Sequence, residues 1–139
     1  MRDFFFAPLE GYEPYETLAR SAGSGALSLA FGMAEAQKTH LAAALWRTLR
    51  RPVLFVAPNE GQAARCFDDL TQFLGDGVYL LSSREVALYH ASAVSREIMN
   101  RRVETLHAAV TGQARVIVAS AEALQHRLMP AADFQKHAL

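Results

Sequence analysis

Residues 31–40 read FGMAEAQKTH, and the fold predicted from the sequence depends mainly on them. Gly32, Lys38 and Thr39 hold the relative positions of the phosphate-loop pattern G-x-x-x-x-G-K-[ST], in which only the second glycine is replaced, by Gln37. The pattern indicates a phosphate-binding loop only where it lies between a buried strand and a helix. An apolar run precedes it at 26–31 and helical spacing follows it. We therefore interpret residues 31–40 as a degenerate phosphate loop.

The replacement of glycine by Gln37 predicts a loss of phosphate affinity. In a working loop, backbone N–H groups and the N-terminus of the following helix surround the phosphates, the lysine offsets their charge and the hydroxyl holds magnesium. Gln37 places a side chain where the bare backbone must approach, and Met33 and Glu35 add bulk and negative charge. We expect the three matching residues to form a vestigial cofactor site, with no cofactor bound by this chain.

The sequence offers no catalytic residues to accompany the loop. The best candidate strand for a magnesium-binding acid, 116–118, runs into Ala119-Ser120 instead of an Asp-Glu pair. The five histidines share no ligand spacing within one element, so no metal site is predicted. We expect no enzymatic activity from this chain alone.

The elements on either side of the loop alternate between strands and helices. Buried strands are predicted at 26–31, 52–57 and 115–120, with a weaker one at 77–81. Helices are predicted at about 37–49, from an Asn59 cap to a stop at Gly75, from a Ser95 cap to Gly112, and over 121–128 after Ser120. Buried strands separated by helices imply a parallel sheet between two helical layers. The predicted class is α/β, with residues 1–139 forming a single domain of three layers.

For two of the helices, the spacing of the apolar residues predicts which face is buried. In the first, Leu41, Leu45 and Leu49 recur every four residues with Trp46 alongside, and this stripe should pack on the sheet. In the helix that starts near Ser95, the expected inward residues are Ile98, Met99, Val103, Leu106 and Val110, while Arg96, Arg101 and Arg102 should lie near solvent. These three arginines, together with Arg50 and Arg51, are candidates for a patch that binds DNA phosphates or an acidic protein.

Composition bounds the class of protein. The chain has 139 residues, 51% of them apolar, which suffices for one core. Its 14 basic and 14 acidic residues cancel, so charge-driven binding requires a local patch. The single cysteine, Cys66, has no disulfide or metal partner and should be a buried apolar residue of a helix. No segment approaches the ~20 apolar residues of a membrane span, so a soluble cytoplasmic protein is expected.

Several stretches together resemble a known family. Residues 52–60, PVLFVAPNE, are similar to the second motif of superfamily 2 helicases. With SREVALY at 83–89, SREI at 95–98 and VIVASAEAL at 116–124, the chain over about 12–135 resembles the N-terminal, UvrB-like region of bacterial transcription-repair coupling factors. UvrB itself keeps an intact loop, whereas the loop of the coupling factors is degenerate, so Gln37 favours the latter.

The resemblance implies a RecA-like half-motor fold within a much longer protein. Other domains of that protein bind RNA polymerase and DNA, hydrolyse ATP with magnesium, and release a polymerase stalled at a lesion. The family's contact with UvrA lies mainly in an adjacent domain, so this part would be a non-catalytic scaffold for it.

Two alternatives stay open at the level of sequence. The chain could be the first half of an excinuclease-type or helicase ATPase whose other motifs lie outside these residues, with Lys38 still touching phosphate. It could instead be a nucleic-acid module that acts through the helix carrying Arg96, Arg101 and Arg102.

Overall fold

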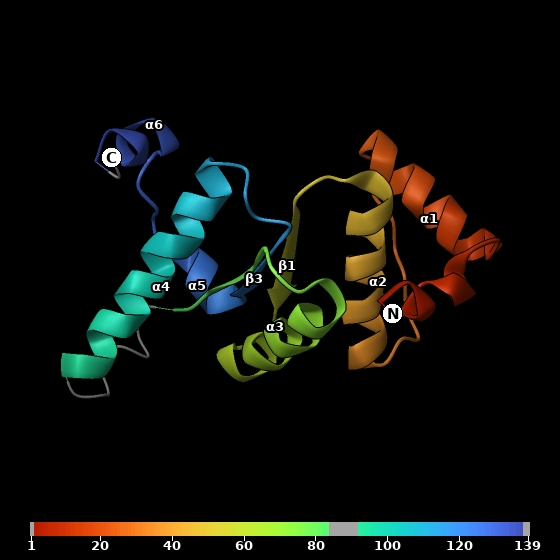
Figure 1. The fold of residues 1–139 in the computed structure, drawn as a ribbon, viewed down its shortest axis with the longest axis horizontal. Coiled ribbons are helices and arrows are strands. Elements are labelled where there is room, and N and C mark those ends of the chain that lie inside the picture. The colour runs from red at the N-terminus through yellow and green to blue at the C-terminus, as the bar shows by residue number, and fades with distance from the viewer. Residues whose placement is uncertain (1, 84–91, 138–139) are drawn as a thin grey trace.

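The computed structural model describes residues 2–83 and 92–137. Part of the family-like stretch, residues 84–89, lies outside them. In chain order the elements are η1 Arg2–Phe5, η2 Ala7–Leu9, α1 Glu13–Ser24, α2 Glu35–Leu49, β1 Val53–Ala57, α3 Glu60–Leu74, β2 Val78–Leu81, α4 Ser92–Val110, β3 Val116–Ser120, α5 Ala121–Gln125 and α6 Ala131–His137 (Figure 1).

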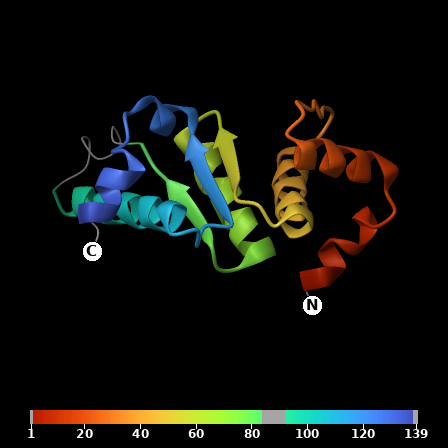
Figure 2. The same ribbon diagram turned by 90° about the horizontal axis from the view of Figure 1, so that it is seen from above.

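The strands form one parallel sheet in the order β1-β3-β2. Val116 and Val118 of the central strand are fully buried in the core beneath α3. Ile117 and Ala119 face the other way, where Leu106 of α4 and Ala123 of α5 cover them. The predicted α/β class, with helices on both faces of a parallel sheet, is confirmed. Figure 2 shows α2 and α1 lying beyond β1, on the side of the molecule away from β2.

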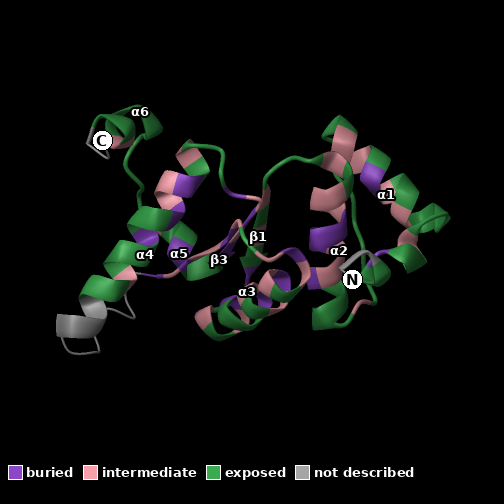
Figure 3. Cartoon of the chain, in the orientation of Figure 1, coloured by how far each residue is buried: buried purple, intermediate pink, exposed green. Residues whose placement is uncertain are grey.

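The predicted strand at 26–31 is wrong. These residues form an irregular connection between α1 and α2, which is exposed along its length (Figure 3), and Leu27, Leu29 and Phe31 are almost completely accessible to solvent. A strand requires a neighbouring backbone to complete its hydrogen bonds. Among the described residues, β1 pairs only with β3, and no strand pairs with 26–31. The apolar pattern of a strand is present, but the described residues contain no neighbouring strand for it.

The predicted helix caps before α3 and α5 are confirmed. The Asn59 side chain accepts a hydrogen bond from the Gln62 N–H at 2.9 Å, and Ser120 accepts one from Ala123 at the same distance. Gly75 ends α3 with a φ of 70°, which glycine adopts without strain. α5 ends at Gln125, three residues earlier than expected, and α4 begins at Ser92, so Ser95 lies inside the helix.

The buried face of α2 is not the one that its leucine stripe predicts. The buried residues are Thr39, Ala42, Ala43 and Ala44, whereas Leu41 and Leu45 are half-buried. The alanines allow α2 to approach α3 closely, and α2 contacts α3 far more extensively than it contacts β1 of the sheet. The expected packing of the stripe on the sheet is therefore wrong.

α4 is also rotated from its predicted orientation. Arg102 and Thr105 are buried against β2 and donate to the carbonyl oxygens of Ser82 and Leu80 at 2.6 and 3.1 Å. Met99 and Val103, expected to face inward, are exposed. Hydrogen bonds to carbonyls at the end of β2 stabilise this orientation, and an apolar periodicity alone contains no information about them.

Candidate functional site

The loop at 32–40 lies at the start of α2, as the sequence predicts, but it follows an unpaired segment. Gly32 has a φ of 76°, a conformation that favours glycine. The helix begins at Glu35, three residues beyond Gly32. The motif residues therefore come together at the N-terminus of a helix, without a strand in front of it.

Gln37 has a structural role in this loop. Its side-chain oxygen accepts a hydrogen bond from the backbone N–H of Ala34 at 2.8 Å. This is the reach-back half of a capping box, which satisfies one of the N–H groups left open at a helix start. A phosphate at this position would compete with the Gln37 carboxamide for that N–H.

Thr39 does not present its hydroxyl to the helix N-terminus. The residue is completely buried between α2 and α3, where its Oγ1 lies 2.9 Å from the Ala36 carbonyl oxygen and 3.3 Å from Oδ2 of Asp69. Lys38 is exposed. The set formed by Gly32, Gln37, Lys38 and Thr39 does not fit a magnesium nucleotide, because one N–H and the only hydroxyl are already engaged.

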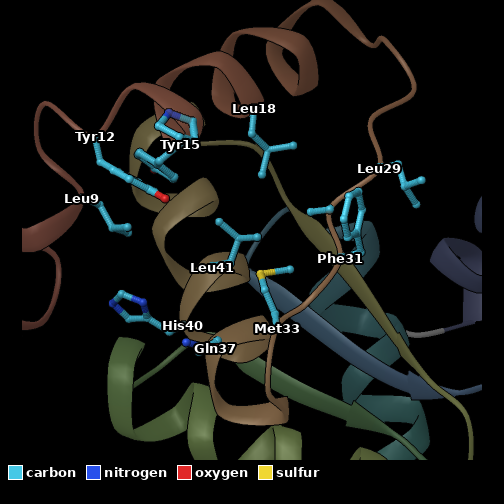
Figure 4. A pocket seen from close by; sticks show the side chains of 12 residues that line it. Leu9, Tyr12, Tyr15, Leu18, Leu29, Phe31, Met33, Gln37, His40 and Leu41 are labelled. Atoms are coloured by element: carbon cyan, nitrogen blue, oxygen red, sulfur yellow. The ribbon is translucent and has the colours of Figure 1, made fainter.

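An apolar pocket of about 480 Å³ opens beside Gln37 (Figure 4). Its walls come from the N-terminal segment and α1, from the exposed 29–33 connection and from α2. His40 lines it, but its Nε2 lies 2.7 Å from the Phe5 carbonyl oxygen and its ring stacks on Phe6 at 5.2 Å. The histidine is therefore held by packing, and the pocket presents mostly carbon to solvent.

Cys66 is the buried helical residue that its spacing predicts. Its thiol lies 3.9 Å from Oε1 of Glu35. Burial, followed by the negative charges of Glu35 and Asp69, raises the pKa of the Cys66 thiol. The thiol therefore stays protonated and unreactive near neutral pH.

A carboxylate that the sequence analysis missed joins the ends of two strands. Glu60, the first residue of α3, accepts hydrogen bonds from the hydroxyl of Ser120, the last residue of β3, and, at 2.8 Å, from the Ser83 N–H after β2. The carboxyl ends of parallel strands are the usual ligand edge of such sheets. Here the Glu60 carboxylate connects the ends of β2 and β3 at that edge. Within the described ranges, no group of three His, Cys, Asp or Glu residues could hold a metal ion.

The three arginines of α4 do not form one exposed patch. Arg96 and Arg101 are exposed, and Arg101 pairs with Glu97 at 2.7 Å. Arg102 is 3% exposed and faces β2, so its expected place near solvent is wrong. A role for Arg96 and Arg101 in binding stays a prediction.

The fold and site define an α/β protein with a parallel sheet and an altered phosphate-loop-like turn. Over 88 residues the chain is 30% identical to the transcription-repair-coupling factor of Escherichia coli (strain K12). The match covers 63% of this chain and 8% of that protein, so the chain spans less than a tenth of its relative's length. The similarity relates the two proteins without indicating a particular domain. No known family profile matches the chain, and no solved structure does.

None of the helices in residues 2–83 and 92–137 is both long and apolar enough to cross a membrane.

Proposed function

We propose that this chain is a non-catalytic, UvrB-like domain of a transcription-repair coupling factor, with the fold of a RecA-like half-motor. The similarity to the Escherichia coli coupling factor and the parallel sheet support the proposal. The complete protein would release RNA polymerase stalled at DNA lesions and recruit the nucleotide excision repair machinery. This part would support the adjacent domain that contacts UvrA, while ATP and magnesium act in other domains.

One observation carries the non-catalytic part of the proposal. The Gln37 carboxamide occupies the N–H of Ala34, where a phosphate oxygen would have to bind. Displacing it would leave a glutamine side chain beside the anion and lose a helix cap. The engagement of Thr39 with Ala36 and Asp69 removes the hydroxyl that magnesium requires.

A calorimetric titration of the 139-residue chain with ATP and magnesium tests this function. We expect no binding heat, because the loop lacks both a free anion site and a metal ligand. A Lys38→Ala variant should give the same flat titration. Micromolar binding by the natural chain that disappears in Lys38→Ala would contradict the proposal.

The first half of an excinuclease-type or helicase ATPase is the second candidate. The spacing of Gly32, Lys38 and Thr39 and the exposure of Lys38 favour it. It requires that residues outside this chain complete the site. In that case the Lys38→Ala substitution in the full-length protein would abolish its ATPase activity.

A nucleic-acid module that acts through α4 is the weaker reading. The burial of Arg102 removes one of the three cations from the surface, and the ion pair with Glu97 offsets the charge of Arg101.

A further inference from the structure

Four arginines gather at the opposite edge of the sheet from Glu60, at the amino ends of the strands. Arg47 lies in the last turn of α2, Arg50 and Arg51 follow it before β1, and Arg115 precedes β3. β1 and β3 are paired and parallel, with Val53 opposite Val116. The residues before the two strands therefore lie at the same edge.

Contacts within the protein hold each guanidinium of this cluster in place. Those of Arg50 and Arg115 lie over the Trp46 ring, at 4.9 and 5.0 Å from its centre, and that of Arg47 lies 4.5 Å above Phe6. Arg51 donates to the Gly23 carbonyl oxygen at 3.0 Å. Arg115 also donates to the carbonyl oxygen of Leu74 at 3.1 Å.

These contacts reduce the cost of binding. A free arginine side chain loses much of its rotamer entropy when it is fixed on a ligand. Stacking on an aromatic ring or bonding to a carbonyl fixes much of that freedom before the ligand arrives. Arg50 and Arg51 remain exposed and keep donors directed to solvent, since each guanidinium carries five.

We infer that the cluster of Arg47, Arg50, Arg51 and Arg115 binds the phosphate backbone of nucleic acid. The chain as a whole has no net charge, so charge-driven binding depends on a local group of cations such as this one. Arg50 and Arg51 are its exposed members.

The chemistry of the cluster favours nucleic acid over an acidic protein. All four cations are arginines, whose planar forks match phosphate oxygens in pairs. Protein interfaces depend on buried apolar anchors. None of the exposed large apolar residues of the described chain lies between α2 and β1 or directly before β3, and the nearest along the chain is Leu54 within β1. The inference does not rest on the proposed repair function.

Fluorescence anisotropy with a labelled DNA duplex of about 20 base pairs tests the inference on the 139-residue chain. We expect binding at about 50 mM salt that weakens steeply toward about 200 mM. The double variant Arg50→Gln/Arg51→Gln should lose at least about tenfold in affinity. Its slope of log K against log salt should fall by about 1.8, the value for two lost phosphate contacts.

Two further variants make the result specific. Arg96→Gln/Arg101→Gln removes the same charge from the exposed part of α4 and should change the affinity less than about twofold if binding is local. Arg50→Lys/Arg51→Lys keeps the charge and should retain the salt slope. Circular dichroism confirms that each variant is folded.

The inference is overturned if no binding occurs at low salt, or if the two glutamine variants lose affinity equally. If the lysine variant also lost the salt slope, the loss of affinity in the glutamine variant would result from disturbed packing on Trp46. That result would also overturn the inference. Competition by polyglutamate as strong as that of unlabelled duplex, at equal charge, would assign the surface to acidic proteins instead.

Discussion

At the scale of single residues, Gln37 shows how one side chain changes the chemistry of a helix start. A glycine there leaves the N–H groups of the first turn open to an anion. Glutamine at the third helical position instead reaches back to the Ala34 N–H. The residue that breaks the phosphate-loop pattern therefore also stabilises the helix that follows it.

Gln37→Ala should lower the free energy of unfolding by about 1 kcal/mol, because the Ala34 N–H loses its side-chain acceptor. Gln37→Glu is the control. It keeps an acceptor at the same reach and places a negative charge near the helix N-terminus, so its stability should equal or exceed that of the natural chain. Urea denaturation measures both, and equal stabilities of the alanine and natural proteins would show that the cap contributes nothing.

Among the elements, β1 is an edge strand, and in the described part of the chain it pairs only with β3. Val53 donates its N–H to the carbonyl oxygen of Arg115, the residue before β3. Backbone groups alternate sides along a strand, so those of Leu54 and Val56 point away from β3. The same two residues are 56% and 49% exposed. We therefore expect solvent to reach their amides.

Hydrogen exchange should resolve this alternation. We expect the amides of Leu54 and Val56 to exchange much faster than that of Phe55, which faces β3, and that of Val118 in the central strand. Amide exchange measured by NMR on the 139-residue chain gives each rate separately. Equal protection of Leu54, Phe55 and Val56 would mean that another segment pairs with β1.

In the molecule as a whole, the connection before α2 carries three strongly exposed apolar residues, Leu27, Leu29 and Phe31. Leu29 and Phe31 also line the apolar pocket beside Gln37. Exposed apolar surface binds apolar dyes and promotes association.

Replacing Leu29 and Phe31 together by serine should lower the fluorescence of bound anilinonaphthalene sulfonate and leave the free energy of unfolding within about 0.5 kcal/mol of the natural value. Leu70→Ala is the contrasting variant, because Leu70 is completely buried in the core. It should cost about 2–5 kcal/mol. A large loss of stability in the serine variant would show that 26–31 is packed against the protein in solution.

The features that depend on neighbours along the chain could be predicted from the amino-acid sequence. Asn59 and Ser120 cap their helices as predicted, because a cap requires only a side chain and an N–H two or three residues away. The apolar runs at β1, β2 and β3 became parallel strands, since buried strands joined by helices have few other arrangements. The phosphate-loop pattern also lies at a helix start, as expected.

Which elements contact one another could not be predicted from the sequence and is seen in the folded chain. Residues 26–31 have the pattern of a strand but no partner backbone, and a pattern cannot supply one. The alanine face of α2 and the Arg102 face of α4 were selected by contacts with α3 and β2. The gathering of Arg50 and Arg115 around Trp46 joins residues far apart in the chain. The physical reason is common to these cases: periodicity describes one surface of an element, and packing depends on the surface opposite it.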